Sequence, residues 1–210
     1  TEAPTLNEIN DLNVLEDAPQ QTVNLAGITD GDDGEQPLQV TAASNNTLLL
    51  ANPTVVYTSP NATGTLSFTP IADKFGVSTI TVTVTDGGAD KNLATTGDNL
   101  TTSRTFDVTV NPVNDEPTLI QPDDLTIDED APRQTVNLNG ITAGGGETQN
   151  LAVTAVSSNT SLIADPTVVY SSANATGRLK FTPLADQNGT ATITVTVIDG
   201  GLDNDLATTV

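Results

Sequence analysis

The chain has 210 residues with 27 acidic and 6 basic side chains, a formal net charge of −21, and no Cys, His, Met or Trp. Without His or Cys it lacks an imidazole base, a thiolate nucleophile and the usual zinc ligands, which excludes most familiar hydrolases. So few basic side chains cannot neutralise a row of phosphates, and we expect no nucleic acid partner. No apolar run reaches the roughly 18 to 20 residues that span a bilayer, so we expect no membrane insertion.

Short β-strands are predicted along the first 113 residues, in chain order. The runs alternate apolar and polar side chains, as half-buried antiparallel strands do. Asn, Asp, Gly and Pro separate them, and no helical window interrupts them. About seven short strands over this length predict a Greek-key β-sandwich. The clearest runs are 22–25, 38–42, 54–57, 66–69, 79–84 and 106–110.

The sequence repeats itself after 113 residues, without a gap. Pro53–Tyr57 (PTVVY) matches Pro166–Tyr170, and about 60 of roughly 94 aligned positions are identical, which indicates a tandem array. We therefore expect an all-β protein with two Greek-key β-sandwiches in tandem, residues 1–113 and 114–210. The second copy stops before any counterpart of the strand at 105–110, so we expect it to lack its last strand. Because the chain starts at Thr1, we interpret it as a piece of a longer protein.

Acidic residues gather at the ends of the predicted strands. In a sandwich these ends meet at two poles, where carboxylates repel one another unless a cation bridges them. Calcium takes about six to eight oxygen ligands and suits such clusters. Each residue alone is equally well explained as a turn former. The candidates up to the junction of the copies are Glu16, Asp17, Asp30, Asp32, Asp33, Asp73, Asp86, Asp90, Asn114, Asp115 and Glu116.

Two segments carry a resemblance to a known family. Val110–Pro117 (VNPVNDEP) resembles the linker between cadherin repeats, and Thr81–Gly88 (TVTVTDGG) resembles the cadherin strand that ends in an aspartate. The whole unit is similar to the cadherin-like, immunoglobulin-like tandem repeats of large bacterial surface and secreted adhesins. This resemblance covers essentially the full chain. It implies an extracellular or cell-surface location and calcium ions between consecutive domains.

The resemblance also implies which residues bind calcium, position by position. In the second copy, small residues replace three aspartates of the loop at 29–35, so only Glu147 can substitute there. We expect about one to three ions at the junction of the copies. The junction ligands would be Glu16, Asp73, Asn114, Asp115, Glu147 and Asp199. Ligands toward a preceding domain would be Asp30, Asp32, Asp33 and Asp86, and those toward a following domain Glu129 and Asp186.

These features lead to two hypotheses about function, from different classes. The first is a calcium-stiffened spacer or adhesion repeat, whose partners are neighbouring repeats, other copies, or a surface protein or glycan. The second is a filament subunit that accepts a donated strand beside 192–198 of the second copy. A binding module on a larger secreted enzyme is a third reading. The sequence offers it no aromatic platform, because core packing explains Tyr57 and Tyr170 better. We expect no enzymatic activity, since the paired acids lie at joints and not in a cleft.

Overall fold

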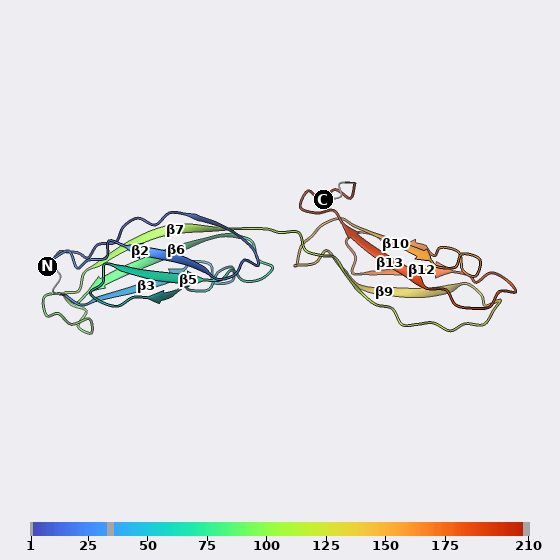
Figure 1. Cartoon of the computed structure of the whole chain (residues 1–210), viewed down its shortest axis with the longest axis horizontal. Coiled ribbons are helices and arrows are strands. Elements are labelled where there is room, and N and C mark those ends of the chain that lie inside the picture. The colour runs from blue at the N-terminus through green and yellow to red at the C-terminus, as the bar shows by residue number, and fades with distance from the viewer. Residues whose placement is uncertain (1, 33–35, 208–210) are drawn as a thin grey trace. The chain divides into compact units, whose positions relative to one another are not determined.

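The computed structural model describes residues 2–32 and 36–207, so Asp33 lies outside the described residues. The described residues form strands and loops and no helix, and thus no helix that could cross a membrane. This confirms the predicted all-β class. The chain divides into two compact units, Thr1–Val113 and Asn114–Val210, and Figure 1 shows the strands of each.

The first unit is a sandwich of two sheets. One sheet has the strand order β1-β7-β6-β3 and the other the order β2-β5-β4. Strand β1 runs parallel to β7, whereas the other pairs are antiparallel. The strands are β1 (Leu12–Leu15), β2 (Gln21–Ala26), β3 (Leu38–Ser44), β4 (Thr54–Val56), β5 (Thr63–Phe68), β6 (Gly76–Asp86) and β7 (Thr101–Asn111).

The core of the first unit lies between its two sheets. Strand β6 follows the predicted alternation, so Ile80, Val82 and Val84 are fully buried while the threonines between them stay partly exposed. Phe106 of β7 is 2% exposed and lies directly opposite Ile80 in the register. Each predicted run falls largely within a strand, but β6 extends well beyond 79–84. Pairing with β3 and β7 lengthens this ladder past the alternating segment.

The second unit repeats most of this plan with fewer strands. One sheet has the order β11-β12-β9-β8, and the other pairs β10 with β13. Among the described residues, no strand pairs with the other edge of β13. Its apolar residues are therefore only half-buried, whereas their counterparts in β6 are buried. The strands are β8 (Thr118–Ile120), β9 (Gln134–Thr142), β10 (Leu151–Ser157), β11 (Thr167–Val169), β12 (Thr176–Phe181) and β13 (Ile193–Asp199).

Candidate metal centre

A buried aspartate ends the longest strand of the first unit. Asp86 is fully buried at the end of β6, and its Oδ1 accepts hydrogen bonds from the amides of Gly88, at 2.9 Å, and Leu100, at 2.8 Å. Its Oδ2 is also buried but has no hydrogen-bond partner among the described residues. Burying an unpaired charge is strongly unfavourable, so a nearby cation would stabilise a carboxylate oxygen in this state.

Three more polar side chains lie at the same end of the first unit. Asp30 is 1% exposed and accepts the Gln36 amide through Oδ2 at 2.9 Å. Asp32 Oδ2 accepts two bonds, from the Glu2 amide at 3.0 Å and from Gln36 Nε2 at 2.8 Å. Gln36 is 6% exposed, and its Oε1 is a second buried oxygen without a partner in the described part of the chain. This end thus holds several side-chain oxygens close together.

At the corresponding end of the second unit, a different residue makes these hydrogen bonds. Glu147 Oε2 accepts the Asp115 amide at 3.3 Å and Gln149 Nε2 at 3.0 Å. In the repeat alignment, Asp115 corresponds to Glu2 and Gln149 to Gln36. Glu147 therefore makes the same two bonds as Asp32, from a position two residues further along the loop. Glu147 thus takes over the hydrogen-bonding role of Asp32 in this loop.

Asp199 joins the same cluster in the second unit. Its Oδ1 accepts hydrogen bonds from the Gly201 amide at 2.9 Å and from Asn114 Nδ2 at 3.2 Å. Asn114 Oδ1 in turn accepts Gln149 Nε2 at 2.7 Å. The structure therefore brings together four predicted residues, Asn114, Asp115, Glu147 and Asp199, within one unit.

Glycines make room for this cluster. A Cβ on Gly145 would overlap the Asp115 carboxylate, so an aspartate here, as at the aligned position of the first copy, would require the Asp115 side chain to shift. Gly144 lies under the Glu116 carbonyl, just as Gly31 lies under the Ala3 carbonyl in the first unit. The loop at 142–148, in which small residues replace three aspartates, is thus packed against the residues that follow the linker.

A second acidic end occurs in the first unit, around Glu16. This side chain is 2% exposed, and its Oε1 accepts the Val113 amide at 2.7 Å. Its Oε2 is buried and has no hydrogen-bond partner within the described residues. A backbone hydrogen bond also fixes the position of Glu16, because its amide donates to the Asn111 carbonyl at 2.8 Å. Glu16 is therefore held beside the start of the linker.

Asp73 lies near Asp17, the neighbour of Glu16. The Asp73 amide donates to Asp17 Oδ1 at 3.2 Å, and carboxylate oxygens of the two residues lie within 4.8 Å of each other. Both have positive φ, 62° for Asp17 and 56° for Asp73. Aspartate tolerates this left-handed backbone, so a turn-forming role accounts for part of its selection.

The second unit repeats only part of this end. The Asp186 amide donates to Asp130 Oδ1 at 3.0 Å, which reproduces the Asp73–Asp17 pair. Glu129, in contrast, is exposed, whereas its counterpart Glu16 is buried. In the first unit β1 and β7 pair beside Glu16, and the described residues of the second unit contain no such pair. Glu129 therefore lacks the surroundings that bury Glu16.

Sequence reasoning missed two kinds of residue. Gln36 and Gln149 bridge the loop carboxylates but were not predicted, although Gln-x-Leu occurs at the same place in both copies. Asp130 was also missed, although Glu-Asp-Ala-Pro is repeated with it and Asp17. Asp90, in contrast, mainly caps its own turn, since it accepts the Asn92 amide at 3.0 Å.

Part of the chain matches a known protein family, and several solved structures show a weaker similarity. Residues 114–210 match the family of bacterial Ig domains. The extracellular domain of protocadherin GammaB4 matches over 96% of this chain and 33% of its own, with 16% identity and a TM-score of 0.42. Domains 5 and 6 of the S-layer protein SbsC match over 94% of this chain and 97% of theirs, with 16% identity and a TM-score of 0.31.

The titin domains z1z2, solved in complex with telethonin, match over 95% of both chains, with 11% identity and a TM-score of 0.34. No curated protein sequence matches. The family match defines the class of the second unit: residues 114–210 match the bacterial Ig domains, and the expected resemblance to bacterial immunoglobulin-like repeats is confirmed for this part of the chain.

Proposed function

We propose that this chain is a calcium-stiffened spacer from an extracellular or cell-surface protein. The observation that carries the proposal is the pair of buried carboxylates, Glu16 and Asp86. Each uses one oxygen to accept backbone amides, and each keeps a second buried oxygen without a hydrogen-bond partner in the described residues. A hard divalent cation would satisfy these oxygens, since calcium binds carboxylates and amide carbonyls in flexible geometry.

Chain connectivity supports placing ions at the linker. The Val113 amide is bonded to Glu16, and Asn114 and Asp115 follow directly. A residue advances the chain by at most about 3.6 Å, so covalent bonds alone keep Asn114 near the Glu16 carboxylate. An ion bound by Glu16, Asp73, Asn114, Asp115 and Asp199 would replace repulsion between acids with shared ligation. The neighbouring repeats are then the first partners, and calcium the cofactor.

The corresponding prediction concerns thermal stability in calcium. At ten to a hundred times a Kd of about 10⁻⁴ to 10⁻³ M, binding to the folded state adds about 2 kcal/mol. For a unit of this size, we expect calcium to raise the Tm by roughly 10 °C relative to chelator. Calorimetry and calcium titration measure the stabilisation, and solution scattering measures the stiffening. Identical melting and scattering in calcium and chelator would refute the proposal.

Matched variants test where the calcium ions bind. Glu16→Gln and Asp86→Asn keep the shape of each side chain but remove its charge, so each should lose much of the calcium-dependent rise in Tm. Glu8→Gln is the control, because Glu8 is exposed and should leave the rise unchanged. Equal effects of all three variants would show that net charge, and not a built site, explains any response to calcium.

The free edge of β13 favours a second candidate function, polymerisation by strand donation. Strand β6 pairs with both β3 and β7, whereas β13 pairs only with β10 among the described strands. Ile198 is 46% exposed at this edge. An unpaired edge of this kind is a template for a strand of another copy.

We therefore expect a peptide with the sequence of β7 to bind the second unit and to compete with assembly of full chains. Sedimentation at rising protein concentration would show oligomers that this peptide dissolves, while a peptide of scrambled sequence would not. A monomeric mass at every concentration would rule out donation.

A further inference from the structure

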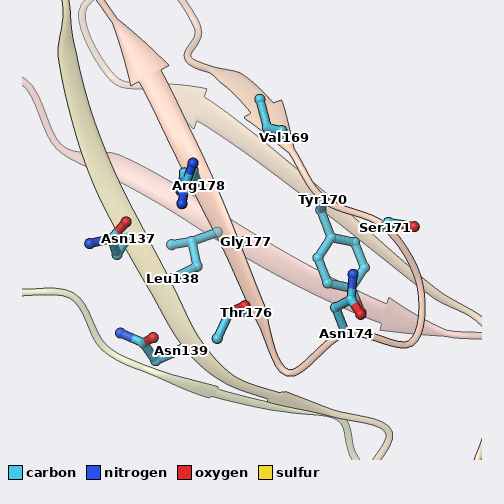
Figure 2. A pocket seen from close by; sticks show the side chains of 10 residues that line it. All are labelled: Asn137, Leu138, Asn139, Val169, Tyr170, Ser171, Asn174, Thr176, Gly177 and Arg178. Carbon is cyan, nitrogen blue, oxygen red and sulfur yellow. The ribbon is translucent and has the colours of Figure 1, made fainter.

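An open groove lies on one sheet of the second unit, and its β11–β12 loop reaches the end that holds Asp199, because Ser172 Oγ accepts the amide of Leu151, which pairs with Asp199. It has a volume of about 450 Å³, within the usual range of ligand sites, which runs from about 300 to 1,000 Å³. Figure 2 shows Asn137 on β9, Arg178 on β12, and Tyr170 and Asn174 in the connection between β11 and β12. Its lining combines amide, hydroxyl and guanidinium groups with the apolar side chains of Leu138 and Val169.

The charge of this sheet is opposite to that of the protein. The four strands β8, β9, β11 and β12 contain no Asp or Glu, whereas the whole chain has 27. They contain Arg178 and Lys180, which lie two residues apart on β12 and so on the same face. Neither side chain makes a hydrogen bond or an ion pair with any described residue. This face is a local positive patch on an acidic protein.

The first unit lacks the patch, although the two copies are otherwise closely similar. Thr65 and Ser67 occupy the positions of Arg178 and Lys180, and Ala26 occupies that of Asn139. Strands β2, β4 and β5 of the first unit carry no charged residue at all. The folding of this sheet therefore does not require the two cations, because the first unit forms it without them.

The strand register places the polar groups in two rows. Arg178 pairs with Asn137 on one side and with Val169 on the other, and Thr176 pairs with Asn139. Side chains of directly paired residues lie about 5 Å apart. The Arg178 side chain is thus flanked by the Asn137 amide on one side and by the apolar Val169 on the other. The Tyr170 hydroxyl is buried without a partner among the described residues, and burial raises the pKa of Tyr170 above its usual value of 10.0.

We propose that this groove binds an acidic saccharide, through the carboxylate of a hexuronic acid unit. The planar guanidinium of Arg178 matches a carboxylate with two parallel hydrogen bonds, and Lys180 adds a second positive charge. Asn137, Asn139 and Asn174 offer both donors and acceptors, which suit the neighbouring hydroxyls of a sugar ring. An acidic peptide offers the same carboxylate but not the ring hydroxyls, so an oligoglutamate distinguishes the two ligands. This inference concerns only the second unit and does not depend on calcium.

The test uses the full chain and short oligogalacturonates in chelator, so that calcium does not bridge ligand and protein. Binding is followed by NMR chemical-shift titration. The test variant is Arg178→Thr/Lys180→Ser, which takes both residues from the aligned positions of the first copy. The control is Lys74→Gln/Lys91→Asn, which removes the same charge by taking residues from the second copy. Both variants use side chains that the other repeat already accommodates.

We expect oligogalacturonate to shift the resonances of β9 and β12, and the test variant to bind at least about tenfold more weakly. The control should bind as the unmodified chain does, and the methyl-esterified oligomer should bind at least about tenfold more weakly than the acid. Equal binding by the test and control variants would overturn the proposal. Equally tight binding of an oligoglutamate at the same strands would overturn the saccharide and point to an acidic protein.

Discussion

Replacing Phe106 with alanine should lower the Tm of the first unit by about 20 °C and leave that of the second unit unchanged. Phe106 is 2% exposed and faces Ile80 across the β6–β7 ladder, in the middle of the sandwich. Such a truncation typically costs about 3 to 5 kcal/mol, because it removes buried area and leaves a cavity. A domain of about 100 residues loses roughly 4 to 8 °C of Tm per kcal/mol. Calorimetry gives the two transitions, and hydrogen exchange assigns each to its unit.

Phe75→Ala is the matched control, since Phe75 is 57% exposed in the loop before β6. It removes the same atoms from a surface position, and we expect a Tm shift of only a few degrees. A similar loss for both variants would mean that β7 is not part of the core of the first unit. A loss in both transitions after Phe106→Ala would mean that the two units unfold as one.

The fold was largely predictable from sequence because one physical signal dominates it. Alternation of Ile and Val with Thr at 79–84 specifies a strand with one buried face, and the structure buries Ile80, Val82 and Val84 accordingly. Repetition then predicts the same strand in the second copy. The ends of strands were less predictable, as β6 and β7 show. They are set by pairing with neighbours that are distant in sequence.

The acidic residues of the candidate site could be predicted from the sequence, but their geometry could not. Strand ends place Asp86 and Asp199 at equivalent positions, as expected. Nothing in the sequence said that Asp86 and Glu16 would be buried with one oxygen each left without a partner. That state depends on the amides of Leu100 and Val113, both far along the chain. The basic groove was missed because a β-sheet brings Asn137 and Arg178 together only through its register.

Gly144→Ala should destabilise the second unit by about 3 kcal/mol and also weaken its acidic cluster. Gly144 has φ of +93°, which costs other residues about 1 to 2 kcal/mol, and a Cβ there would overlap the Glu116 carbonyl oxygen and lie 2.9 Å from Asp115 Cβ. Backbone cannot move aside as a flexible side chain can, so overpacking adds a further cost of about 1 to 3 kcal/mol. Denaturant unfolding of the second unit measures the change.

Gly146→Ala separates the cost of a positive φ from the cost of the steric overlap, within the same loop. Gly146 also has positive φ, +74°, but a Cβ there would meet no atom within 4 Å. This variant should therefore show only the backbone cost, about 1 to 2 kcal/mol. Displacing Asp115 and Glu116 in Gly144→Ala also breaks the bond from the Asp115 amide to Glu147. Calcium stabilisation of the second unit should then fall in Gly144→Ala and persist in Gly146→Ala. Equal destabilisation by the two variants would show that the residues after the linker do not pack against this loop.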